Sequence, residues 1–196
     1  RMVPGADTAM MERNLLRITA SDVLERNLYI GTSKLKDEEG IPAALLSDAK
    51  FLEADHRTPK YDDWWAFPVC AFTGVFSGNE RAVYEQIRED DNIRKIILTR
   101  GQPVALEGQN LIVVPLESPE GQYYLLRAKV VFIKHTPTRN LVYPLSGELH
   151  HLINLWHGIP LKRIGYASLD QQTRSHAIAQ EHSRCKAVIS SSHIDT

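Results

Sequence analysis

The sequence predicts an α/β domain in which a Rossmann-like parallel sheet is covered by helices on both faces. From about residue 61 to the end, short and continuous apolar runs alternate with amphipathic segments at helical spacing. Strands that are apolar on both sides are typical of parallel sheets buried between two layers of helices. The hydrophobic fraction of 43% and the charged fraction of 24% exclude a disordered or low-complexity chain.

Each element is predicted from its own local pattern. Strands are expected where apolar runs lie between turn residues. These runs cover residues 67–72, 95–99, 111–115, 129–134, 152–156 and 187–190. Helices are expected at 79–90, 118–128 and 170–184, and residues 42–54 also have helical composition. We expect Asn79 to cap the first of these three helices, and Ser118 with Pro119 to open the second.

The first sixty residues differ from the rest of the chain. Residues 1–10 are small and polar, and the alternating pattern becomes clear only from Trp64 onward. We therefore assign residues 1–60 to an N-terminal extension or leader, and residues 61–196 to the Rossmann-like domain. The sequence stops just after a predicted strand, where an α/β domain normally continues with a helix. A truncated chain, or half of a larger protein, is therefore expected.

Charge and cysteine content exclude several classes of function. The net charge of −1 argues against a generic nucleic-acid-binding protein, which is usually far more basic. No apolar run approaches the roughly 20 residues that a membrane span needs. The two cysteines, Cys70 and Cys185, form no C-x-x-C pair and no disulfide framework, which indicates a cytoplasmic protein. The sequence leaves open a peripheral contact with the inner face of the cell membrane.

The charge is distributed unevenly along the chain. Residues 1–120 carry 14 basic and 20 acidic side chains, whereas residues 121–196 carry 9 basic and 4 acidic ones. The second segment therefore favours a phosphate or another anion. A chance separation of charge between two parts of a chain of this length is the alternative at this point. The sequence nevertheless lacks the P-loop, the G-x-G-x-x-G dinucleotide fingerprint, the G-x-S-x-G elbow and the H-E-x-x-H zinc motif. No cofactor is predicted.

The segment Asn154–Lys162, NLWHGIPLK, is the strongest candidate site. His157 is expected at the carboxyl end of a parallel strand, where open α/β sheets place their ligands. Gly158 allows a sharp turn, and Lys162 with Arg163 supplies cations next to it. A titratable base beside an anion site suits the transfer of a phosphoryl group to a hydroxyl. A structural role for His157 and a solvated surface role for the two cations remain the alternatives at this point.

Several segments resemble the CDP-glycerol glycerophosphotransferase family of teichoic-acid and capsule polymerases. NLWHGIPLKRIG resembles the family signature W-H-G-T-P-L-K. FPVCAFTGVFSGNERAVY, at residues 67–84, is similar to the opening strand, the turn and the N-P-K-x-x-Y helix start of the family. YYLLRAKVVF at 123–132 and AVISSS at 187–192 are similar to further segments, in the same order and at similar spacing.

The resemblance implies the N-terminal, acceptor-side half of a GT-B-like architecture with two domains. Such enzymes transfer a polyol phosphate from a CDP-polyol donor to a hydroxyl of a phosphate polymer or a lipid-linked primer, and CMP leaves. His157 would be the catalytic base, with Gly158 and Lys162 as phosphate or cleft contacts. Arg163, the second of the two adjacent cations, is assigned to the substrate from its charge and position. The nucleotide-binding half, with its G-x-P-R-x-D stretch, is absent from this sequence, so this fragment is expected to be inactive by itself.

This sequence departs from the family pattern at two positions, and two other functions stay open. Ile159 stands where the family often has a hydroxyl residue, and Glu80 stands where it has proline. One alternative is a non-catalytic Rossmann-like module that binds a phosphate polymer or a protein partner. The other is a metal-dependent hydrolase. We do not expect a metal, because the adjacent His150 and His151 would point to opposite faces of a strand.

Overall fold

A parallel sheet of six strands forms the centre of the domain and confirms the predicted fold class. The computed structural model describes residues 40–71, 74–158 and 175–189, all of which belong to the compact unit that begins at Gly40. The strands are β1 (Tyr61–Pro68), β2 (Arg94–Thr99), β3 (Leu111–Pro115), β4 (Ala128–Ile133), β5 (His151–Asn154) and β6 (Ala187–Val188). The described helices are α3 (Asp48–Arg57), α4 (Asn79–Ile87), α5 (Pro119–Arg127), α6 (Pro137–Asn140) and α7 (Ser175–Ser183).

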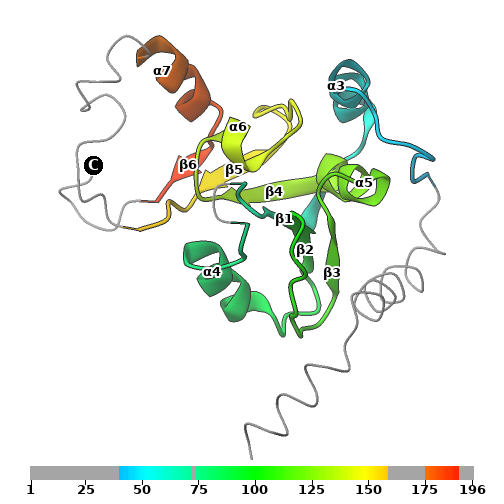
Figure 1. Cartoon of the computed structure of the whole chain (residues 1–196), viewed down its shortest axis with the longest axis vertical. Helices are drawn as coiled ribbons and strands as arrows, with labels where there is room; N and C mark the ends of the chain where they lie inside the picture. Colours follow the sequence, from blue (N-terminus) through cyan, green and yellow to red (C-terminus); the bar gives the residue numbers. More distant parts are fainter. Residues whose placement is uncertain (1–39, 72–73, 159–174, 190–196) are drawn as a thin grey trace, which may run out of the picture. The chain divides into compact units, whose positions relative to one another are not determined.

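The strand order is β3-β2-β1-β4-β5-β6, and every pair of neighbours is parallel (Figure 1). The chain starts in the middle of the sheet, runs outward to β3, and then returns to place β4 on the other side of β1. This is the strand order of Rossmann-type sheets, and it creates a switch point between β1 and β4. Ligands of such sheets bind at the carboxyl ends of the strands beside the switch point.

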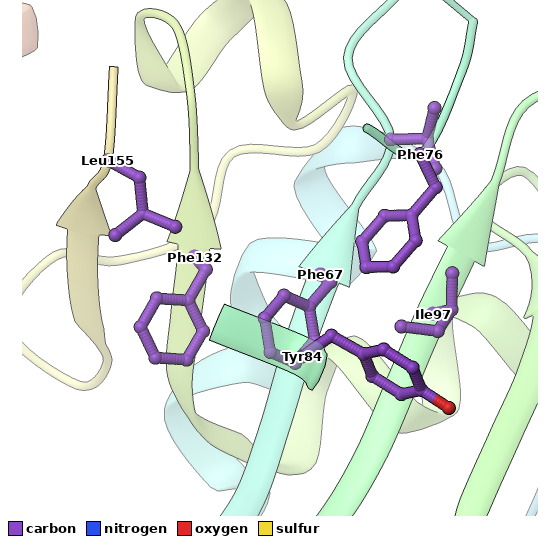
Figure 2. Packing of buried hydrophobic residues seen from close by; sticks show 7 residues of the cluster. Phe67, Phe76, Tyr84, Ile97, Phe132 and Leu155 are labelled. Carbon is purple, nitrogen blue, oxygen red and sulfur yellow. The ribbon is translucent and has the colours of Figure 1, made fainter. Parts of the chain in front are cut away.

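One face of the sheet packs against α4 through an aromatic cluster (Figure 2). The rings of Phe67 on β1 and Phe132 on β4 stack with their centroids 4.9 Å apart. Tyr84 of α4 is fully buried and meets the ring of Phe76 edge to face at 5.8 Å. Burial of each such side chain stabilises the fold by roughly 2–3 kcal/mol. The cluster therefore fixes α4 against the strands whose carboxyl ends carry the candidate site.

The opposite face of the sheet packs against α5. Adjacent residues of a strand point to opposite faces, so Trp64 lies on the other side of the sheet from the α4 cluster. Its ring contacts Tyr124 of α5 at 5.6 Å. The side chain of Ser118 accepts a hydrogen bond from Gly121 N at 2.9 Å, which confirms the predicted helix start. An added Cβ at Gly121 would lie 2.1 Å from Pro115 O, so α5 approaches the sheet too closely for any larger residue.

The strand boundaries differ from the predicted ones where composition conceals the pairing. β1 spans Tyr61–Pro68 instead of the predicted 67–72, so residues 69–71 lie beyond its end. It begins at Tyr61 because Tyr61 pairs with Ala128, although the segment Tyr61–Asp63 is exposed and reads as a loop in the sequence. β5 ends at Asn154 instead of Trp156. Leu155 N still donates to Ile133 O of β4, and the chain turns away from the sheet at Trp156, whose φ is 55°. Both limits depend on pairing with β4, which is not adjacent to β1 or β5 in the local sequence pattern.

The packed unit begins before position 61, where the sequence placed the domain boundary. Phe51 and Asp55 of α3 are fully buried, and Phe51 stacks on Tyr143 at 4.7 Å. The carboxylate of Asp55 lies 2.7 Å from His150 Nε2, which joins α3 to the start of β5. The helix α3 therefore belongs to the same packed unit as the sheet. Within the described residues, no helix has the length and the apolar character to cross a membrane.

Candidate functional site

Two histidines lie side by side at the carboxyl edge of the sheet. His157 follows β5, and His135 follows β4. Their ring centroids are 5.7 Å apart, and the ring planes are inclined by 30°. His157 is exposed, and His135 is half-buried. His157 lies close to the end of a strand, as predicted, whereas His135 was not among the predicted site residues.

The turn before His157 is strained and is held by two asparagines. Trp156 has a φ of 55°, in the left-handed region that costs a residue other than glycine about 1–2 kcal/mol. Asn154 Oδ1 accepts a hydrogen bond from Trp156 N at 2.9 Å. Asn79 Nδ2 donates to Leu155 O at 2.7 Å and to Trp156 O at 3.3 Å. These bonds stabilise the conformation that directs the chain, and with it His157, away from β5.

The predicted capping role of Asn79 is wrong. Gly78, with a φ of 68°, occupies the cap position of α4, and no side-chain hydrogen bond caps this helix. The Asn79 side chain instead reaches the carbonyl groups of the turn after β5. A capping prediction considers only nearby backbone groups, whereas the acceptors of Asn79 lie more than seventy residues further along the chain.

A buried ion pair supports the loop between β1 and α4. Lys134 Nζ lies 3.0 Å from Glu80 Oε2, and both side chains are almost completely buried. The same ammonium donates to the backbone oxygens of Val75 and Ser77 at 3.2 and 3.4 Å. Burial raises the pKa of Glu80 to about 7, although Lys134 and Asn140 act in the opposite direction. Glu80, which replaces the proline of the family pattern, thus forms a charged contact beneath this loop.

The protonation state of His135 follows from its hydrogen bonds. Its Nδ1 accepts from the backbone N–H of Thr136 at 2.8 Å, so the proton of the neutral ring is on Nε2. Burial lowers the pKa of His135, and the positive charge of Arg139, together with that of His157 whenever its ring is protonated, acts in the same direction. Its backbone is also fixed, because its N–H donates to Asn140 Oδ1 and its carbonyl accepts from Asn154 Nδ2. His135 is therefore a rigidly placed, neutral imidazole.

The remaining predicted site residues separate into two groups. Gly158 is exposed and has a φ of 147°, which glycine adopts without steric cost. Lys162 and Arg163, like Ile159, lie outside the described residues. Trp156 is half-buried and contacts His182 of α7 edge to face at 6.0 Å. The described part of the predicted site is thus the turn that carries His157 and Gly158.

His150 belongs to the opposite edge of the sheet. It is fully buried near the start of β5, where Nδ1 lies 2.5 Å from Ala128 O and Nε2 lies 2.7 Å from Asp55 Oδ1. Both ring nitrogens are therefore occupied by protein atoms. Across residues 40–71, 74–158 and 175–189, no three His, Cys, Asp or Glu side chains gather as metal ligands.

Solved structures with this fold include the wall teichoic acid polymerase TagF. A TagF variant matches with a TM-score of 0.60 and 16% identity, over 88% of this chain and 41% of that one. TagF itself matches with a TM-score of 0.59 and 17% identity, over 88% of this chain and 41% of that one. A variant soaked with CDPG matches with a TM-score of 0.60 and 15% identity, over 90% of this chain and 45% of that one. The likeness confirms the expected fold. This chain spans less than half of the length of TagF.

The sequence also matches a family model. No curated protein sequence gives a significant match. The model described as CDP-Glycerol:Poly(glycerophosphate) glycerophosphotransferase, however, matches residues 55–196, which include β1 to β6 and both edge histidines. The match confirms the resemblance found in the sequence and includes most of the chain. The chain therefore belongs to the CDP-glycerol:poly(glycerophosphate) glycerophosphotransferase family.

Proposed function

We propose that this chain is the acceptor-side domain of a polyol-phosphate transferase. The enzyme would move glycerol phosphate, or a similar polyol phosphate, from a CDP-linked donor to a hydroxyl of a cell-wall or capsule polymer. The acceptor oxygen forms a bond to the phosphorus that carries the glycerol. The bond from this phosphorus to the oxygen that bridges the two phosphates breaks, and CMP leaves with the electron pair. The proton of the acceptor hydroxyl passes to a ring nitrogen of His157.

The exposed position of His157 beyond the carboxyl end of β5 carries this proposal. A general base must approach the proton that it removes, and the imidazole of His157 is accessible at the edge where such sheets bind ligands. The strained Trp156 and the bonds from Asn79 and Asn154 support the same interpretation. Strain that is held by several hydrogen bonds is characteristic of functional sites.

We assign binding of the transferred phosphate to Gly158, Lys162 and Arg163. A glycine permits close approach of a ligand to the backbone, and the two cations follow within five residues of it. The excess of basic residues in 121–196 favours the same anionic ligand. Because the chain spans less than half of TagF, we assign recognition of the cytidine nucleotide to a part of the protein beyond this chain.

The proposal is tested by CMP release from CDP-glycerol by the full-length gene product, with and without a glycerol-phosphate primer. We expect release that requires the primer, with one glycerol phosphate added to the primer for each CMP. CDP-ribitol in place of CDP-glycerol identifies the polyol. If neither donor releases CMP in the presence of the primer, the transferase proposal fails and a binding module replaces it.

A further inference from the structure

His135 occupies the position in this fold where a ligand is most expected. It lies at the carboxyl end of β4, beside the switch point between β1 and β4. His157, by comparison, lies one strand further from the switch point, after β5. Because the two ring centroids are 5.7 Å apart, one phosphate-sized group can contact both imidazoles.

The hydrogen bonds of His135 determine what its imidazole can do. Nδ1 is occupied by the N–H of Thr136, so a second proton could be added there only if this bond broke. His135 is therefore a poor base, and its Nε2–H is a permanent donor. Among the described residues, no hydrogen bond to this Nε2 is found. Arg139 contributes a nearby positive charge, which favours an anionic acceptor for that donor.

We propose that His135 is a second substrate-contacting residue of this site, which donates its Nε2–H to a non-bridging phosphate oxygen of the glycerol phosphate that reacts at His157. This inference rests on the proposed transfer reaction and extends it. The two histidines divide the chemistry between them. His157 takes the proton of the acceptor hydroxyl, whereas His135 remains neutral and stabilises negative charge on the phosphate.

Two substitutions of His135 separate this role from a structural one. His135→Phe keeps an aromatic ring beside His157 but has no donor, whereas His135→Gln loses the ring and retains an N–H donor near the position of Nε2. We expect His135→Phe to lower kcat/KM for CDP-glycerol about tenfold to a hundredfold, as for loss of a hydrogen bond to a charged group. His135→Gln should recover most of this loss and keep the pH–rate profile unchanged. The control is His56→Ala, which removes an exposed histidine of α3.

The pattern among the variants decides between the roles. A tenfold to hundredfold loss in His135→Phe, with most of the activity retained in His135→Gln, supports the donor role. If His135→Phe is active and His135→Gln is inactive, the ring and its packing are what matter, and the proposal is overturned. Equal activity of wild type, His135→Phe and His135→Gln overturns it as well. Unfolding in urea, measured for each variant, identifies any loss that comes from misfolding.

A binding measurement keeps this inference separate from the proposed reaction. Long-range ¹H–¹⁵N spectra report the tautomer of each imidazole, and sn-glycerol 3-phosphate serves as the anionic probe. We expect the Nε2–H tautomer for His135 and a shift of its Nε2 resonance with glycerol phosphate, but not with glycerol. A Nδ1–H tautomer, or no response to the phosphate, overturns the role of His135 even when CMP release succeeds. A response without CMP release supports the anion contact and refutes the transfer reaction.

Discussion

Replacement of Glu80 with glutamine should stabilise the domain at pH 8 and leave its stability near pH 4 almost unchanged. Glu80 is completely buried, and its pKa in the folded protein is about 7, against an ordinary value of 4.5. The folded state therefore binds the proton more tightly than the unfolded state does. This contribution to stability is fully present below pH 4.5 and is lost as the pH rises through 7.

The magnitude follows from the shift in pKa. One pKa unit corresponds to about 1.4 kcal/mol, so the rise of Glu80 to about 7 represents about 3 kcal/mol of unfolding free energy. Glutamine has nearly the same shape as glutamate and does not ionise, so Glu80→Gln should not lose this unfolding free energy as the pH rises. Lys134→Met should have the opposite effect at pH 8, because it leaves the carboxylate buried without its cation.

Urea unfolding, followed by tryptophan fluorescence at pH 5, 6, 7 and 8, measures both effects. We expect the difference between Glu80→Gln and the wild type to grow with pH toward about 3 kcal/mol. Lys134→Met should become less stable than the wild type over the same range. A Glu80→Gln variant that is less stable than the wild type at pH 8 would refute the reasoning, because ionised Glu80 would then stabilise the fold.

Two further predictions concern the turn at His157 and the packing of α5. Asn79→Ala removes both hydrogen bonds to the strained turn. We therefore expect kcat, measured by steady-state kinetics, to fall about tenfold with little change in KM. A change in KM alone would contradict this prediction. Gly121→Ala places a Cβ 2.1 Å from Pro115 O, so we expect a loss of at least about 2 kcal/mol in urea unfolding. An unchanged urea midpoint would show that α5 can move away from the sheet.

The sequence was sufficient for the presence of the strands, because each contains part of a local apolar run, but not for the limits of β1 and β5. The run 111–115 corresponds to β3 in full, and Ser118 caps α5 as its hydroxyl and the following Pro119 predicted. The segment after β5 was found for a similar reason, since His157 and Gly158 directly follow the predicted apolar run 152–156.

The parts of the site that depend on contacts between distant segments were not predicted. His135 becomes a candidate only when β4 and β5 are known to be neighbours, which brings its ring beside His157. The partners of Asn79 lie on another strand, so local pattern suggested a cap instead. The helix α3 was left outside the domain because its anchor, Asp55, binds His150 ninety-five residues later. A polar residue directly after an apolar strand was the available signal for His135.

The role of His157 as the base is tested most directly by CMP release that depends on the primer, from the full-length gene product and its His157→Ala variant. The matched control is His151→Ala, which removes a histidine at the other end of β5. We expect His157→Ala to lower kcat by about 10²- to 10⁴-fold, as for loss of a general base, with an unchanged urea midpoint. The control should retain wild-type turnover. Wild-type turnover by a folded His157→Ala variant would contradict the assignment of His157 as the base.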